Sequence, residues 1–511
     1  MRRTKWACTA LALALVLSAC RGPAPAEETL APTPTATAPA AEAEGLDFVL
    51  PCYPGGGFHP ITGGNRTNLT LSPLMYRGLF ALDRTFQPRN DLCAGYTVSE
   101  DGLTWTFRLA AATFSDNTPL TGAEAAASLN LARQSERYSG RLAGISRVTA
   151  GEGEVTVTLS RPNGALPALL DVPIVKETGD PARPLGTGPY YLTGEGEELE
   201  LTARTGAAVP LAAIPLRSIG ASDDLVYAFD AREISLVDTD LTGTNALGYS
   251  GRFEATDYPT TTLLYVGFNA QSGACRDSEV RRSLSLAFDR RSVAGKLLAG
   301  HAVAAALPVH PESAWYDAEL AAALSYDQAG AWALLEEAGW KLGEDGKLHK
   351  GRSALTLRLV VNQENTYKVT VAEALGEALT GLGCTVTVEK LPWENYLSAL
   401  SKRSFDLYLG ETTLTADFDL GALLGSSGGL NYGGYIDSQT NALMDACRAA
   451  EEPERAGAAA ALCARVAEMA PIAPLCFKNG SLLTQWGQVS GAAPTQRDVF
   501  AGLESWNIKQ F

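Results

Sequence analysis

The sequence has few of the residues from which metal sites are built. It contains four histidines in 511 residues, and they form neither an H-E-x-x-H motif nor a cluster. Its nine cysteines include no C-x-x-C pair, so neither a zinc site nor a disulfide framework is indicated. We expect no metal and no cofactor. We expect most cysteines after Cys20 to be buried small hydrophobic residues, although an oxidising compartment would permit a bridge that spacing cannot assign.

The chain also lacks a convincing catalytic motif. Residues 425–429, Gly-Ser-Ser-Gly-Gly, match the pattern G-x-S-x-G of serine hydrolases. In that class the catalytic histidine follows the serine in the chain, whereas all four histidines here come before residue 425. No strand leads into a helix at this serine either. We therefore expect that the protein is not an enzyme.

Clustered positive charge and long apolar runs are missing as well. The formal net charge is −16, which argues against nucleic acid as a partner because phosphate binding requires grouped lysines and arginines. After the first twenty residues, no stretch approaches the roughly 20 apolar residues of a membrane-spanning helix. A chain of 511 residues is longer than a single hydrophobic core usually supports, so two or three domains are expected.

The N-terminus is typical of a secreted lipoprotein. A basic start is followed by an apolar run from Ala7 to Val16 and by Leu17-Ser18-Ala19-Cys20. This predicts a signal peptide over residues 1–19 and lipidation of Cys20 after cleavage. A plain signal peptide followed by an incidental cysteine is the alternative. Residues 20–45 begin at this cysteine and continue in alanine, proline, threonine and glutamate, which predicts a disordered tether.

Alternating strand and helix patterns follow this tether. Residues 96–109 form a hairpin pattern around the turn Glu100-Asp101-Gly102, and Thr121 with Glu124 predicts a capped helix. Residues 263–266 predict a strand. The apolar residues from Val280 to Phe288 then recur at helical spacing after a polar loop. Such alternation indicates sheets with helices packed on them.

Several of these segments together resemble one family. The stretch 262–291, TLLYVGFNAQSGACRDSEVRRSLSLAFDRR, is similar to a signature of the family 5 extracellular solute-binding proteins, the dipeptide, oligopeptide and nickel receptors of ABC importers. Further similarity lies in residues 71–133, in Pro184–Tyr190 (PLGTGPY), in the segment after Asp327 and in Asn431–Tyr435. The glycine-rich segment 184–190 lacks the Lys-Ser/Thr of a phosphate-binding loop and is interpreted as a structural turn.

The resemblance implies an α/β fold with two lobes, of the periplasmic-binding-protein type (type II, large cluster C form). Lobe I is expected to be discontinuous, comprising residues 46–67, 183–262 and 478–511. An extra N-terminal subdomain is expected over residues 68–182, and lobe II over residues 263–477. The chain would cross between the lobes twice, with hinges near Gly267–Ala270 and Phe477–Asn479.

The resemblance also implies a set of ligand-binding residues. Asp417 matches the carboxylate that pairs with a peptide's N-terminal ammonium in oligopeptide receptors, and Asp419 is the neighbouring alternative. Residues 411–415, with Thr413, Leu414 and Thr415 among them, would offer a strand edge to an extended peptide. Four more residues match cleft-lining positions: Trp393, Asn362, Tyr367 and Phe477. Four of the predicted residues have an alternative role in the fold. Trp393 and Phe477 could be core aromatics, Asn362 a turn former and Asp417 a helix cap.

The function implied is capture of short peptides outside the cell and delivery to an ABC permease and its ATPase. The protein would be a monomer attached to the membrane through Cys20, on the periplasmic or cell-wall side. Receptors of this group commonly have Trp just before the aspartate, whereas this chain has Thr413-Leu414-Thr415 and an insertion. A receptor for a nickel chelate or an oligosaccharide is therefore an alternative, as is a lipoprotein that senses peptides without importing them.

Overall fold

The structure is a computed structural model that describes residues 47–244, 246 and 248–509. The predicted signal peptide, the predicted lipidation site at Cys20 and the predicted tether lie outside these residues. Within the described part, helices and strands alternate along the chain, as the sequence indicated. No helix in this part of the chain is long and apolar enough to cross a membrane.

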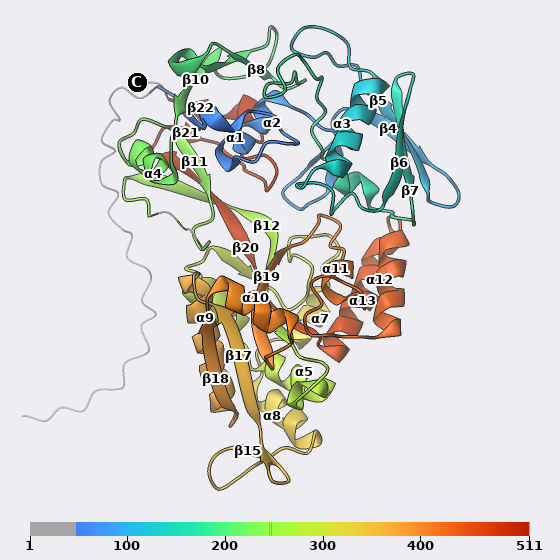
Figure 1. Cartoon of the computed structure of the whole chain (residues 1–511), viewed down its shortest axis with the longest axis vertical. Coiled ribbons are helices and arrows are strands. Elements are labelled where there is room, and N and C mark those ends of the chain that lie inside the picture. The colour runs from blue at the N-terminus through green and yellow to red at the C-terminus, as the bar shows by residue number, and fades with distance from the viewer. Residues whose placement is uncertain (1–46, 245, 247, 510–511) are drawn as a thin grey trace, which may run out of the picture. The chain divides into compact units, whose positions relative to one another are not determined.

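A seven-stranded mixed sheet carries the chain between the lobes (Figure 1). Two of its strands are long and antiparallel to each other, β12 (Phe253–Phe268) and β20 (Ile472–Gln485). Strand β12 also pairs with β19 (Leu407–Thr413), and β20 also pairs with β11 (Leu236–Thr239). The order of six strands is β11-β20-β12-β19-β17-β18, where β17 is Thr356–Asn362 and β18 is Thr385–Leu391. The seventh strand, β13 (Ala302–Ala304), pairs with β20.

The pairing of β12 with β20 breaks where the chain passes from one lobe to the other. Pro259 pairs with Asn479 and Leu263 with Phe477, with a register shift between the two pairs. The hinge expected near Phe477–Asn479 therefore coincides with this register break. The hinge expected near Gly267–Ala270 lies after this break, and there Asn269 and Ala270 donate backbone hydrogen bonds to Asp406 and Gly433.

The segments expected to form lobe I and the extra subdomain share one hydrophobic core, with residues from Phe48 to Trp506. Lobe I contains the sheet β1-β10-β9-β8, formed by Leu50–Cys52, Ala213–Ser218, Glu200–Ala203 and Tyr190–Thr193. The subdomain contains the antiparallel sheet β4-β5-β7-β6, formed by Cys93–Val98, Thr104–Leu109, Glu154–Leu159 and Ile145–Gly151. Helix α3 (Gly122–Gln134) packs on β6 and β7.

The segment expected to form lobe II, residues 263–477, has two cores, one on each side of its strands. The first lies under helices α5 (Ser278–Leu286), α8 (Gln328–Glu337) and α9 (Thr366–Gly381). The second lies with α10 (Trp393–Ser401), α12 (Ser438–Ala449) and α13 (Glu454–Met469), and it also includes Phe86 and Ala168 of the subdomain. The remaining helices are α1 (Arg66–Thr70), α2 (Ser72–Met75), α4 (Ser222–Asp230), α6 (Arg290–Ser292), α7 (Ala318–Ala323) and α11 (Gly421–Leu424).

The local sequence signals explain where several elements begin. Thr121 and Glu124 form the predicted capping box of α3, and Asp277 caps α5 by accepting from the Glu279 N–H. Gly102, with φ of 68°, makes the turn of the β4–β5 hairpin. The cysteines of the described chain are free, and all but the half-buried Cys447 are buried, which confirms their expected role in packing.

Candidate functional site

The candidate site is a loop that leaves the end of strand β19 and carries Asp417. The Asp417 side chain is 4% exposed and has only neutral hydrogen-bond partners. Its Oδ1 accepts from the Thr415 hydroxyl and from the Asp419 N–H at 3.3 Å, and its Oδ2 accepts from the Asn163 amide at 3.2 Å. No described lysine, arginine or histidine forms an ion pair with this carboxylate. Because a buried carboxylate is costly without a cation, Asp417 is suited to receive one.

Asp417 lines a cavity of about 500 Å³, which we call the Asp417 cavity. The subdomain contributes Asn163 and Leu166, while lobe II contributes the segment that follows β19 and part of α12. The charged residues on its wall are Arg137, Arg141, Arg161, Asp417, Asp419, Arg448 and Arg497. Two of them form a pair within lobe II, because Arg448 contacts Asp419 at 2.7 Å. The cavity size falls in the usual range for small-molecule sites.

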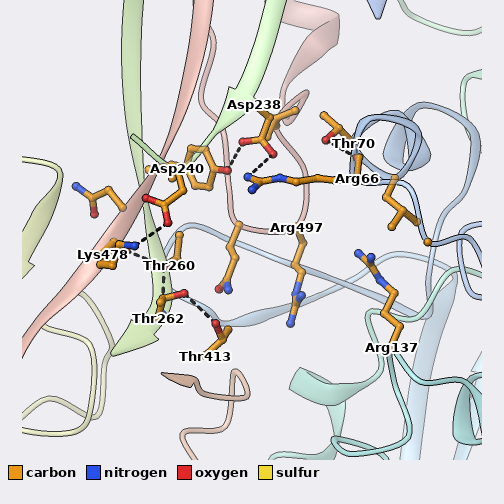
Figure 2. Close-up of a pocket in the computed structure, with 17 residues that line it drawn as sticks. Arg66, Thr70, Arg137, Asp238, Asp240, Thr260, Thr262, Thr413, Lys478 and Arg497 are labelled. Carbon is orange, nitrogen blue, oxygen red and sulfur yellow. Dashed lines mark hydrogen bonds and ion pairs between the residues drawn. The ribbon is translucent and has the colours of Figure 1, made fainter. Parts of the chain in front are cut away.

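A second cavity of about 500 Å³ lies beside the two crossing strands, and we call it the hinge cavity (Figure 2). It shares Arg137, Thr413 and Arg497 with the Asp417 cavity. Its acidic residues have cationic partners: Asp238 lies 3.5 Å from Arg66, and Asp240 lies 2.7 Å from Lys478. Figure 2 shows these pairs as dashed lines, whereas Arg137 and Arg497 have none to the residues drawn.

Lys478 is the centre of a chain of charges beside the register break between β12 and β20. Its side chain is 3% exposed, and its Nζ lies 2.7 Å from Asp240 and 3.4 Å from Glu411 of β19. Lys368 of α9 lies 3.2 Å from the same Glu411 oxygen. The chain therefore links lobe I to lobe II through groups that neutralise one another. A lysine inside the apolar run that forms β20 is a signal that sequence reasoning could have used.

Burial also shifts the ionisation of Asp238 in the hinge cavity. Desolvation raises the pKa of this carboxyl group, and the nearby Arg66 and the Tyr258 hydroxyl act in the opposite direction. Burial and the neighbouring Asp238 raise the pKa of Tyr258, which therefore remains a hydrogen-bond donor. The hydrogen bond from Tyr258 to Asp238 therefore connects β12 to β11 across the intervening strand β20.

The strand edge predicted at residues 411–415 borders the Asp417 cavity. Strand β19 pairs with β12 along its length, but its recorded pairing with β17 covers Leu407 and Tyr408. The Leu414 N–H donates to the Thr261 carbonyl at 2.9 Å, so backbone alternation directs the main-chain N–H and C=O of Thr413 away from β12, while its hydroxyl contacts that of Thr262 at 3.0 Å. Thr412 to Thr415 line the cavity on this side.

The structure brings together some of the predicted ligand-binding residues and not others. Thr413, Leu414, Thr415, Asp417 and Asp419 all line the Asp417 cavity. Trp393, Asn362, Tyr367 and Phe477 line neither of the two cavities described above.

Those four residues occupy different surroundings. Asn362 ends β17 and donates to Glu364, which also accepts from the Trp393 N–H at 3.1 Å. Trp393 is 54% exposed and stacks on Tyr396, and Tyr367 packs against the first core of lobe II. Phe477 is fully buried, with its ring centroid 5.1 Å from that of His310, so the structure places it among core aromatics.

Sequence reasoning missed the subdomain's contribution to the site. Asn163 and Arg137 come from segments more than 200 residues before Asp417, and their types and spacing carry no motif. The Gly164 N–H donates to the Arg448 carbonyl at 2.9 Å, so the subdomain is in direct contact with lobe II at the cavity wall. The serine at 427 lies in a loop after α11, not at a strand-to-helix turn.

Residues 87–431 match the model of the bacterial extracellular solute-binding proteins, family 5 (middle region). Protein XP55 of Streptomyces lividans is 28% identical over 427 residues, which are 76% of this chain and 78% of XP55. The oligopeptide-binding protein AppA of Bacillus subtilis is 22% identical over 63% of this chain and 62% of its own length.

Solved structures show the same fold. The structure of B. subtilis AppA with a nonapeptide has a TM-score of 0.60 at 19% identity, covering 91% of this chain and 98% of AppA. NikZ of Campylobacter jejuni, solved with Ni(L-His), has a TM-score of 0.64 at 18% identity, covering 91% and 99%. The expected two-lobed α/β fold is therefore confirmed.

Proposed function

Because this chain belongs to family 5 of the bacterial extracellular solute-binding proteins, we propose that it captures short peptides outside the cytoplasm for an ABC importer. The partners would be a permease and its ATPase, which supplies the energy. Lipidation of Cys20 would keep the protein at the membrane surface. The expected lobe boundaries, with crossings at the β12–β20 register break, would let the lobes close around the ligand by a hinge motion.

One observation carries the proposal for peptides: the buried Asp417 carboxylate has no cationic partner in the described chain and faces a cavity beside an open strand edge. A peptide's ammonium would supply the missing positive charge. Its backbone could add to the edge of β19 by main-chain hydrogen bonds, which do not depend on the peptide's side chains. The similarity to AppA, an oligopeptide-binding protein, supports this ligand class.

The test starts from protein freed of bound ligand by unfolding and refolding. Native mass spectrometry before this step would reveal any co-purified solute. Calorimetric titration then compares peptides of two to five residues with their N-acetylated forms. We expect free-amine peptides to bind, and acetylation to weaken binding at least about 100-fold because the ammonium is lost. Binding of nickel–histidine without binding of any peptide would overturn the peptide proposal and favour a chelate receptor, as for NikZ.

A further inference from the structure

Two phenylalanines have a backbone conformation that bulky residues rarely adopt, and their rings are in contact. Phe86 has φ of 66° and Phe418 has φ of 52°, both in the left-handed region. Their ring centroids lie 5.6 Å apart at an interplanar angle of 88°, which is the favourable edge-to-face arrangement. Phe86 lies in the turn between β2 (Phe80–Leu82) and β3 (Pro88–Asn90), whereas Phe418 directly follows Asp417. Such a conformation persists at a bulky residue only where its surroundings impose it.

The turn that carries Phe86 is held together by its own backbone and not by the Phe86 ring. The Phe86 N–H donates to the Asp83 carbonyl at 3.0 Å, and the Gln87 N–H donates to the Asp83 carboxylate at 3.0 Å. The Phe86 ring is 2% exposed and belongs to the second core of residues 263–477, where its centroid lies 5.0 Å from that of His310. The turn thus inserts one side chain into a core that is built mainly by a distant part of the chain.

The conformation of Phe418 shapes the Asp417 loop, by which we mean residues 414–420 between β19 and α11. The Phe418 N–H donates to the Thr415 carbonyl at 2.9 Å. The chain then turns at Phe418, so that the Asp419 N–H reaches back to Asp417 Oδ1 at 3.3 Å. The left-handed residue therefore sets the backbone from which the Asp417 carboxylate faces the cavity.

Three aromatic rings surround the Phe418 side chain, which is 5% exposed. The centroids of Trp315 and Phe477 lie 6.2 Å from that of Phe418, and Phe86 is closer at 5.6 Å. Of these three, Phe86 is the one that comes from outside residues 263–477. Its contact with Phe418 therefore exists only while the turn between β2 and β3 is docked.

We propose that Phe86 is a positioning residue for ligand binding, whose docked ring holds the Asp417 loop in the conformation that presents Asp417 to the cavity. Undocking of the turn would remove one of the contacts that impose the left-handed conformation at Phe418, and the loop would gain other conformations. Docking of the turn and binding of an ammonium group then favour each other, because both require the same loop conformation. The ligand part rests on the proposed function, whereas the dependence of the loop on Phe86 is a property of the protein alone.

The first experiment measures hydrogen–deuterium exchange in the ligand-free protein by mass spectrometry of proteolytic fragments. Phe86→Gly removes the ring but suits the φ of 66°, so the turn itself is not strained. We expect backbone exchange in the Asp417 loop to rise at least about tenfold, because its amide hydrogen bonds depend on the loop conformation. The matched control is Phe80→Leu on β2 of the same hairpin. The Phe80 ring is also 2% exposed but contacts Tyr96 and Phe107 within the subdomain, so this variant should lose stability without faster exchange in the loop.

Two results of this experiment would overturn the inference. One is loop exchange that is unchanged in Phe86→Gly, and the other is an equal rise in Phe80→Leu. If Phe86→Gly does not fold, Phe86→Leu keeps apolar bulk without the ring and provides the same comparison.

The second experiment is a double-mutant cycle on peptide affinity, which tests whether Phe86 acts through Phe418. Phe418→Gly also tolerates the left-handed conformation and removes the other ring. We expect Phe86→Gly to weaken peptide binding about tenfold in the otherwise unmodified protein, and by less than about twofold in Phe418→Gly, where the ring contact is already lost. Equal losses in both backgrounds would assign Phe86 a purely structural role and overturn the inference. Faster loop exchange in Phe86→Gly, with no peptide bound by the unmodified protein, would support the positioning role and overturn only the peptide proposal.

Discussion

The hinge cavity and the Asp417 cavity have the same volume of about 500 Å³ and share three wall residues, yet their charges are arranged differently. In the hinge cavity, Asp238 and Asp240 each have a cation from the protein. In the Asp417 cavity, the buried Asp417 carboxylate has no cation from the described chain. Paired charges hold the two crossing strands in place, whereas unpaired ones leave interaction energy for a ligand.

This contrast indicates which substitutions should affect stability and which should affect binding. Removing one member of a buried pair leaves the other charge without compensation, so the folded state is destabilised. Removing an unpaired buried charge does not destabilise the folded protein in this way, but it weakens ligand binding. Each prediction below tests that division, and they run from the largest effect to the smallest.

Lys478→Met should have the largest effect on stability. It leaves Asp240 without its cation at the hinge, and we expect the free energy of unfolding to fall by roughly 3 to 4 kcal/mol. Urea unfolding measures the change. Lys390→Met is the control, since Lys390 and Glu373 are 46% and 48% exposed and should contribute less than about 1 kcal/mol. Equal stability of the two variants, with loss of ligand binding in Lys478→Met, would place the hinge charges in the binding site.

His310 shows that an unpaired group marks a ligand site only when it faces a cavity. Its Nε2 is buried without a hydrogen-bond partner, but its ring lies between Phe86 and Phe477 and lines neither cavity. Burial lowers its pKa to about 4 from 6.5, with Arg84 acting in the same direction. The unfolded chain therefore takes up a proton at a higher pH than the native protein. The contribution of the neutral His310 to the free energy of unfolding is fully present above pH 6.5 and is lost as the pH falls toward 4.

We expect this loss to reach about 3 kcal/mol between pH 7 and pH 4. His310→Asn should remove that part of the pH dependence, although it lowers stability at all pH values because a buried ring is lost. Urea unfolding at several pH values gives the slope. His349→Asn, at a partly exposed histidine beside Asp345, should leave the slope nearly unchanged. A slope that persists in His310→Asn would assign the acid sensitivity to other groups.

Asp417→Asn should weaken binding of free-amine peptides about 100-fold, which corresponds to about 2.7 kcal/mol. The free energy of unfolding should change by less than about 1 kcal/mol, because the lost charge has no partner in the protein. Asp419→Asn is the matched control, two residues further along the loop. Asp419 is paired with Arg448, so this variant should lose stability and retain most of its affinity. The reverse result would exchange the roles of the two carboxylates.

The sequence predicted local structure well because the signals for it are local. The capping box at Thr121 and Glu124, the Asp277 cap and the hairpin turn at Gly102 each involve residues within a few positions of one another. The strand expected at 263–266 extends over Phe253–Phe268 because β20 supplies a partner along it. Strand β20 lies some 200 residues further along the chain, and no local sequence pattern predicts this pairing.

The candidate site was predictable only in part for the same reason. The similarity to the family led to Asp417 and to the segment after β19, which do line one cavity. Arg141, Asp171 and Arg497 come from a subdomain loop, a second loop and the C-terminal segment, respectively, and they meet only in the folded protein. Phe477 shows the opposite case, because an aromatic residue in an apolar strand has the same sequence pattern whether it faces a cleft or a core.

The smallest predicted effect concerns the contact that closes the Asp417 cavity. A Cβ at Gly164 would lie 2.1 Å from the Ala450 carbonyl oxygen, so Gly164→Ala cannot keep this approach. We expect the segment to move away, with loss of the Asn163–Asp417 hydrogen bond and about tenfold weaker peptide binding, roughly 1.4 kcal/mol. Gly144→Ala is the control, because Gly144 lines the same cavity and has no atom within 4 Å of the added Cβ. Equal affinities of the two variants would show that subdomain contact with lobe II is not needed for binding, and would leave Asp417 as the part of the wall on which affinity depends.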